Sequence, residues 1–205
     1  TSIKISDELT LAGNTTLTGN ATLGVVDADL AANNRTLSIV SSGTSTFGGN
    51  VGATQRLGSI TSNSGGSTVI KGAAVNATTQ TYGDSVTVGV DSTFTGTTVK
   101  FAGTVNGSGK NLTINADGAT TFGDKVGNSG AFLLLETDED GTTSINGTTL
   151  SAKTLKLNDP VTLGSDVVVT AATQANVLNT VNGDISDTRS LTINSPDTQI
   201  GSAGV

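Results

Sequence analysis

The stretch NLTINADGATTFGDKVG, residues 111–127, decides the fold because its pattern already occurs earlier in the chain, as TLSIVSSGTSTFGGNVG, residues 36–52. Apolar positions are kept in the two stretches, while the residues between them vary. The matched pairs include Leu37 and Leu112, Phe47 and Phe122, and Val51 and Val126, all with the same offset of 75 positions. Self-similarity at a fixed offset is typical of repeat architectures, in which each unit buries its apolar residues against the next unit.

Apolar and polar residues alternate within each copy, as they do in Leu112-Thr113-Ile114. Residues 9–11 and 161–163 follow the same pattern. A period of two, with many β-branched residues, indicates β-strands. No stretch long enough for an amphipathic helix combines helical periodicity with good helix formers. The sequence therefore predicts an all-β chain with short strands.

The repeat extends over the whole chain. The segment that begins at Asp7 resembles the one that begins at Asp84, and the segment from Ser190 reopens the pattern seen from Asn111. We therefore predict one continuous domain over residues 1–205. Its internal repeats would be residues 1–34 (partial), 35–109, 110–189 and 190–205 (partial).

A shorter motif recurs inside the long repeat. It reads TFGGNV at Thr46, TYGDSV at Thr81, TFGDKV at Thr121 and KLNDPV at Lys156, so that successive copies start 35, 40 and 35 positions apart. Each copy is expected to place a bulky residue inward, then turn a corner at a residue that tolerates positive φ, then place a Val inward. The predicted corner residues are Gly48, Gly83, Gly123 and Asn158. Each of these spacings fits two coils of about 18 to 20 residues.

These features predict a parallel β-solenoid with a single winding path and about 10 or 11 coils, stacked about 4.8 Å apart. A closed barrel or a sandwich would not explain a pattern that runs through the whole chain with open ends. The expected core residues, stacked coil on coil, are Leu37, Phe47, Ile70, Tyr82, Val86, Leu112, Phe122, Ile145, Leu157 and Val161.

Composition narrows the chemistry. Thr (37), Gly (27), Ser (21) and Asn (17) make up half of the 205 residues, and aromatic residues are only 3%. Cys and His are both absent, so thiolate nucleophiles, disulfides, imidazole bases, haem and the usual zinc sites are excluded. The net charge of -7 repels phosphate backbones. We expect no cofactor, no nucleic-acid partner and, since the longest apolar run is residues 131–135, no transmembrane segment.

Acidic residues gather before Gly141, where Asp138 and Asp140 are candidate ligands for Ca²⁺. Neither the EF-hand spacing nor the glycine-rich calcium repeat of β-rolls is present, so a solvated turn is the favoured interpretation and no metal site is predicted. The corner residues Asp84, Asp124 and Asp159 are expected to make local hydrogen bonds to the turn backbone.

Paired threonines raise the alternative of an ordered hydroxyl surface for ice or carbohydrate. The pairs are Thr44 and Thr46, Thr79 and Thr81, Thr93 and Thr95, and Thr120 and Thr121. A flat ice-binding face needs Thr at the same position of every coil, whereas these pairs shift between corners and strands. We therefore expect threonine to serve as an ordinary outward strand residue.

A polysaccharide lyase or hydrolase is a further alternative, because some β-helices cleave acidic glycans. Such chemistry needs paired carboxylates in a cleft, which is usually built by long loops. The near-constant spacing of the motifs leaves little room for long loops, and Arg35, Arg56 and Arg189 are the only arginines. We expect no enzyme activity.

The repeated units LTINADGATTFGDKVG and LSIVSSGTSTFGGNVG resemble the repeats of large bacterial surface proteins similar to filamentous haemagglutinins. The resemblance covers nearly all of the chain. It implies a right-handed β-helical shaft, an extracellular or bacterial cell-surface location, and binding of host or surface glycans through other domains. The expected partners of this chain are flanking repeats of a longer chain or other copies along the axis.

The function expected from the sequence is that of a non-catalytic structural stalk within a secreted or cell-surface adhesin. A second possibility is a self-assembling subunit that stacks head to tail into an extracellular filament, because an open solenoid leaves unpaired strand edges at its ends. A polysaccharide-binding or polysaccharide-cleaving β-helix is the least favoured of the three functions.

Overall fold

The computed structural model describes residues 1–184 and 188–201 and contains strands, turns and one short 3₁₀ helix, η1 (Ala31–Asn33). No α-helix occurs among these residues. The strands of the first half are β1 (Ser2–Ile5), β2 (Leu9–Leu11), β3 (Thr15–Thr18), β4 (Asn20–Leu23), β5 (Val26–Ala28), β6 (Thr36–Val40), β7 (Thr44–Phe47), β8 (Leu57–Ser62), β9 (Ser67–Ile70), β10 (Ala74–Tyr82) and β11 (Ser85–Val88). Those of the second half are β12 (Ser92–Phe101), β13 (Val105–Asn106), β14 (Asn111–Phe122), β15 (Phe132–Thr137), β16 (Thr142–Ile145), β17 (Thr149–Leu157), β18 (Val161–Leu163), β19 (Val167–Val177), β20 (Val181–Gly183), β21 (Leu191–Asn194) and β22 (Thr198–Ile200).

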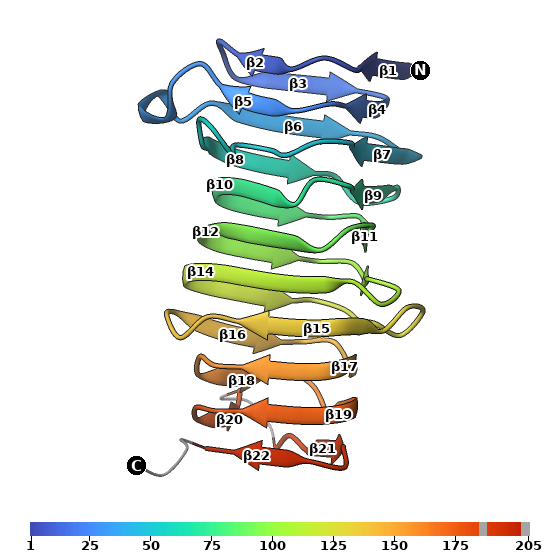
Figure 1. Cartoon of the computed structure of the whole chain (residues 1–205), viewed down its shortest axis with the longest axis vertical. Coiled ribbons are helices and arrows are strands. Elements are labelled where there is room, and N and C mark those ends of the chain that lie inside the picture. Colours follow the sequence, from blue (N-terminus) through green and yellow to red (C-terminus); the bar gives the residue numbers. More distant parts are fainter. Residues whose placement is uncertain (185–187, 202–205) are drawn as a thin grey trace.

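Every strand pairs in parallel with strands of the neighbouring coils, and the coils stack along one axis with the two termini at opposite ends (Figure 1). The coils differ in length, since Leu9 pairs with Val26, whereas Val26 pairs with the more distant Val51. The prediction of an all-β parallel β-solenoid is confirmed, with about 10 coils. The right-handed winding stays a prediction.

Each coil has three faces, which can be followed through one turn of the chain. Val86 and Val88 of β11 point inward on face 1, Phe94 in the first half of β12 points inward on face 2, and Val99 and Phe101 in its second half point inward on face 3. The two halves of β12 pair with the two halves of β14. In the next coil, the first half of β14 pairs with β15 and its second half pairs with the separate strand β16. The long strands β12 and β14 therefore run around the corner between faces 2 and 3.

The core consists of columns of inward-facing residues that are direct partners in successive coils. A long column lies on face 3 and contains Leu17, Ile39, Ser62, Tyr82, Phe101, Phe122, Ile145 and Leu163. The strand pairing continues to Gly183, which is exposed. The ten residues expected in the core are all buried, with at most 2% of their surface exposed. Because the core is continuous from coil to coil, each coil depends on its neighbours for burial.

The long sequence repeat does not place equivalent residues in the same column. Val51 pairs with Val75, which pairs with Phe94, which pairs with Ile114, so three full coils end on face 2 at Ile114. The chain then passes along face 3 before it reaches Val126, the repeat equivalent of Val51, on face 1. One sequence repeat thus equals three and two-thirds coils. Equivalent residues of successive repeats therefore lie on different faces, as Val51 does on face 2 and Val126 on face 1.

The short motif follows the same rule. Tyr82 and Phe122 belong to one column, with Phe101 between them, so the longer of the motif spacings is two coils as predicted. Phe47 instead lies on face 1, paired with Ile70, and Leu157 lies on face 2, paired with Val177. The prediction of two coils is therefore wrong for the two shorter spacings, which correspond to one and two-thirds coils. All three faces can use the motif because each alternates inward and outward residues in the same way.

The predicted corner residues Gly48, Gly83, Gly123 and Asn158 directly follow the strands β7, β10, β14 and β17. None of them has a positive φ, so the expected conformational reason is wrong. At the three glycine corners the reason is instead the close packing on the coil before: a Cβ on Gly123, for example, would lie 2.9 Å from the carbonyl oxygen of Phe101. Positive φ occurs shortly after two of these corners, at Gly52 (63°) and Gly127 (70°), which are themselves equivalent positions of the long repeat.

Candidate functional site

Two buried aspartates link neighbouring coils at the corners. One carboxylate oxygen of Asp84 accepts a hydrogen bond from the backbone N–H of Gly66 at 2.7 Å. The carboxylate of Asp159 accepts hydrogen bonds from the hydroxyls of Thr137, at 2.9 Å, and Thr143, at 2.8 Å. The expectation of a local turn bond is therefore wrong for Asp84, whose partner lies in the coil before. Asp159 does make a local hydrogen bond to its own backbone, and it also accepts the two hydroxyl bonds from the coil before. Both carboxylates therefore form hydrogen bonds that connect one coil to the coil before it.

The third expected corner residue, Asp124, does make a local bond, because its carboxylate accepts the backbone N–H of Lys125 at 2.7 Å. Its side chain is exposed, unlike those of Asp84 and Asp159. Asp159 can be buried because the neighbouring coil provides two inward-facing hydroxyls, which donate hydrogen bonds to its carboxylate.

The candidate calcium ligands Asp138 and Asp140 lie together in the structure with a third carboxylate, that of Asp117. One carboxylate oxygen from each of the three lies within 4.8 Å of the other two. Burial, together with the negative charges of Asp140 and Asp117, raises the pKa of Asp138. Sequence reasoning missed Asp117 because it precedes Asp140 by a whole coil, and only the length of that coil places one above the other.

Three carboxylates are hard ligands of the type that Ca²⁺ prefers, but they supply only part of the six to eight oxygens that the ion binds. Asp117 and Asp140 are exposed, and the turn backbone provides part of the hydrogen bonding of Asp138. The arrangement is a cluster of two exposed carboxylates and one half-buried carboxylate, whose oxygen atoms are compatible with a hard cation.

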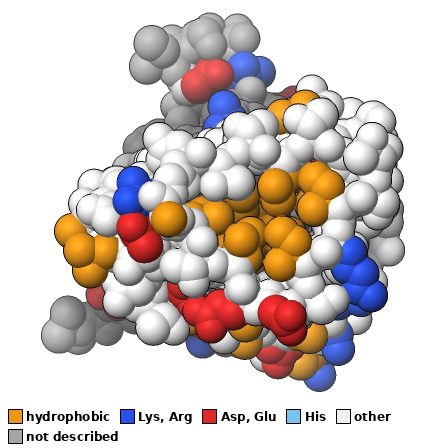
Figure 2. Space-filling model, turned by 90° about the horizontal axis from the view of Figure 1, so that it is seen from above, with side chains coloured by type: hydrophobic (Ala, Val, Ile, Leu, Met, Phe, Trp, Pro, Cys, Tyr) orange, Lys and Arg blue, Asp and Glu red, His pale blue; other side chains and the backbone are white. Residues whose placement is uncertain are grey.

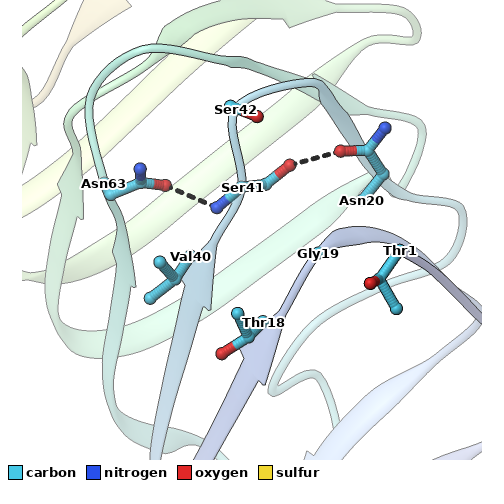
Figure 3. Close-up of a pocket in the computed structure, with 8 residues that line it drawn as sticks. All are labelled: Thr1, Thr18, Gly19, Asn20, Val40, Ser41, Ser42 and Asn63. Atoms are coloured by element: carbon cyan, nitrogen blue, oxygen red, sulfur yellow. Dashed lines mark hydrogen bonds between the residues drawn. The ribbon is translucent and has the colours of Figure 1, made fainter.

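A shallow hollow of about 360 Å³ lies at the corner between faces 3 and 1 near the N-terminus (Figure 3). Asn20 and Asn63 flank Ser41 from the coils on either side: the hydroxyl of Ser41 lies 2.7 Å from Asn20 Oδ1, and its backbone N–H donates to Asn63 Oδ1 at 2.8 Å. Among the described residues that line this hollow there is no carboxylate, Lys or Arg side chain. Its lining therefore offers polar contacts but none of the acid and base groups that glycan cleavage needs.

Outward-facing hydroxyls form two ladders on face 3. The central ladder, whose members are direct partners in successive coils, contains Thr16, Ser38, Thr61, Thr81, Lys100, Thr121, Ser144, Thr162 and Asn182. The flanking ladder, two residues earlier in each strand, contains Thr36, Ser59, Thr79, Thr98, Ala119 and Thr142. Both ladders point outward because their residues alternate with the buried column.

The ladders correct one expectation from the sequence. Of the threonine pairs considered there, Thr79 and Thr81 lie on the two ladders, whereas Thr44 and Thr46 lie on face 1 and Thr93 lies on face 2. Those pairs do shift between positions, and no position of face 3 carries Thr in every coil, as expected. The expectation nevertheless overlooked the central ladder, in which seven of the nine residues are Thr or Ser. The sequence does not reveal these ladders, because the number of residues between paired positions on this face varies from coil to coil. It is smaller from Ser144 to Thr162 than from Ser38 to Thr61.

Apolar side chains reach the surface at both ends of the solenoid. At the N-terminal end the partly buried residues Ile5, Leu9 and Leu17 pack on the core, and Figure 2, which looks down on this end, shows apolar side chains at its centre. At the other end Val181 and Ile193 are partly buried, and Ile200 is 60% exposed. Among the described residues, the strands that carry these side chains pair with a neighbouring coil on one side only.

No helix in the described part of the chain is long and apolar enough to cross a membrane. No protein-family model matches the chain, and no curated protein or solved structure matches it either. The resemblance to filamentous haemagglutinins thus extends, on these observations, only to the parallel β-solenoid.

Proposed function

We propose that this chain is a structural stalk segment of a secreted or cell-surface bacterial adhesin. The observation that carries the proposal is the column of inward-facing residues on face 3, whose members pair from coil to coil from Leu17 to Leu163. Parallel strands with a continuous core resist bending, since each coil can move only by breaking the hydrogen bonds and apolar contacts to two neighbours. A rod of about ten coils spaced about 4.8 Å apart is about 48 Å long and would hold a distal domain away from the cell.

The test places the chain between an outer-membrane anchor and a terminal epitope on bacteria, and measures the distance of a gold label from the membrane by electron microscopy. A stalk extends this distance by about 48 Å with a narrow distribution, whereas a flexible Gly/Ser linker of equal residue number gives a broad one. A distribution as broad as that of the linker would refute the stalk.

A second candidate is a filament subunit, and the uncovered ends favour it. Leu9 on face 2 is the first member of a column that runs through Val26, and Ile200 is the last member on the same face. A second copy stacked head to tail would cover both residues and pair their unpaired strand edges.

Sedimentation velocity of the 205-residue chain over a range of concentrations separates the two candidates. A filament subunit forms polymers that lengthen with concentration, and Ile200→Asp shortens them, whereas Val40→Asp, on an exposed lateral residue, does not. A monomer at all concentrations excludes the filament and leaves the stalk.

A further inference from the structure

Face 3 presents its hydroxyls with an unusual regularity. Seven of the nine residues of the central ladder are Thr or Ser, and the register of the strand pairs is unbroken over this face. The register shifts between coils lie elsewhere, at Gly96/Thr98 before face 3 and at Ala152/Thr154 between faces 1 and 2. The hydroxyls therefore form a regular array rather than a scattered set.

The hydroxyls of the central ladder are available for an external partner, whereas in the flanking ladder the hydroxyl of Thr142 donates to the carbonyl oxygen of Gly118 at 3.4 Å. In the described residues, no hydrogen bond to another protein group uses the hydroxyls of the central ladder, such as those of Thr61, Thr81 and Thr121. Face 1 differs, because the hydroxyls of Thr44 and Ser67 there lie 2.9 Å apart and bond to each other. The central ladder residues are exposed or half-buried, so their free hydroxyls meet solvent.

The array restricts the chemistry of a ligand. A partner that contacts every hydroxyl must itself repeat in two dimensions, which excludes small molecules and irregular proteins. A sugar polymer usually needs aromatic surfaces on which rings stack, yet Tyr82 and all five Phe residues are buried. Lys100 is the only charged residue of the ladders, so a strongly charged partner is disfavoured as well.

The spacing of the array is close to that of ordered water. Coils repeat about every 4.8 Å along the axis, and residues two apart in a strand are separated by about 6.6 Å. In a tetrahedral network with O–H···O distances of about 2.75 Å, second-neighbour oxygens lie about 4.5 Å apart and the layer repeat of hexagonal ice is about 7.3 Å. Both spacings of the array thus agree with those of ice to within about a tenth.

We propose that face 3 is an ice-binding surface, on which the central and flanking ladders hold water in an arrangement that joins the ice lattice. The threonine hydroxyls supply the hydrogen bonds, and their methyl groups restrict the side-chain rotamers and the positions of the bound water. Lys100 interrupts the central ladder in its middle and reduces the area that can contact ice. This activity is independent of the stalk function, since it uses outward side chains and no core residue.

The experiment measures inhibition of ice recrystallisation and thermal hysteresis by the whole chain. Thr81→Tyr, which places a bulky ring in the centre of face 3, should raise the protein concentration needed for inhibition several-fold. Thr87→Tyr is the matched control, because Thr87 is an exposed outward residue of face 1. Lys100→Thr, which places a hydroxyl in the middle of the central ladder and leaves Asn182 as its only residue without one, should lower the concentration needed. Circular dichroism and the unfolding midpoint of each variant establish that the solenoid is intact.

Equal effects of Thr81→Tyr and Thr87→Tyr would overturn the proposal, as would the absence of ice activity in both the natural chain and Lys100→Thr. Retention on microcrystalline cellulose without any ice activity would also overturn it, in favour of a polysaccharide. Loss of activity confined to the face 3 variant, with a gain from Lys100→Thr, supports it.

Discussion

The rings of Tyr82 and Phe101, which are direct partners in adjacent coils, lie nearly parallel with their centroids 5.3 Å apart and an angle of 13° between their planes. Phe122 continues the stack, with its ring 5.9 Å from that of Phe101. Phe94 packs edge-on against both Tyr82 and Phe101. Four of the six aromatic residues of the chain thus gather in its middle coils.

Phe101→Ala should destabilise the chain strongly. Phe101 is fully buried and contacts three other rings, so its truncation leaves a cavity that the surrounding coils fill only in part. The expected loss in the free energy of unfolding is about 3 to 5 kcal/mol, measured by urea denaturation with circular dichroism. Thr87→Ala on the surface is the control and should change it by less than about 0.5 kcal/mol. Equal midpoints for the two variants would contradict the packing described here.

Tyr82→Phe tests a buried polar network. The hydroxyl of Tyr82 donates to Gln80 Oε1 at 3.0 Å, and Gln80 Nε2 donates to the carbonyl oxygens of Val75 and Thr95. Gln80 is fully buried, so removal of the Tyr82 hydroxyl leaves its Oε1 without a partner. We expect a cost of about 1 to 3 kcal/mol in the free energy of unfolding. A variant as stable as the natural chain would show that water reaches Gln80 or that its side chain finds another donor.

Gly127→Ala tests the left-handed position after the corner. Gly127 has a φ of 70°, and an added Cβ would clash with the backbone carbonyl oxygen of Ser151 in the next coil. Because both the conformation and the close contact oppose a side chain, the unfolding midpoint should fall clearly. Gly13→Ala is the matched control: its φ is not positive, and a Cβ there would meet nothing within 4 Å. A fall of the same size in both variants would mean that the conformation of Gly127 is not the cause.

The sequence predicts which residues are buried better than it predicts which surface residues lie side by side in neighbouring coils. Alternation and β-branched residues identify the strands, and the ten core residues chosen from the motifs are all buried because each lies at an inward position. The coil is harder to predict, since its length varies and each copy of the long repeat begins one face earlier than the copy before it. For this reason the columns, the proximity of Asp117 to Asp140 and the hydroxyl ladders of face 3 become visible only when the coils are superposed.

The stability of the chain should depend on pH through the buried carboxyl group of Asp159. Burial raises the pKa of this carboxyl group, the nearby charge of Asp138 adds to the rise, and the hydroxyl bonds from Thr137 and Thr143 oppose it. The folded chain therefore keeps the proton to a higher pH than the unfolded chain, whose Asp residues titrate near the ordinary pKa of about 3.8.

It follows that the contribution of Asp159 is most favourable below the unfolded pKa and is lost as the pH rises through the raised pKa of the folded state. Asp159→Asn keeps an oxygen to accept one hydroxyl hydrogen bond and an NH₂ to donate to the other hydroxyl, without a charge to desolvate. Urea unfolding of this variant between pH 4 and pH 8 should show a smaller loss of stability with rising pH than the natural chain shows. Identical slopes for Asp159→Asn and the natural chain would mean that Asp159 remains ionised in the fold, and that its two hydroxyl bonds outweigh the burial of its charge.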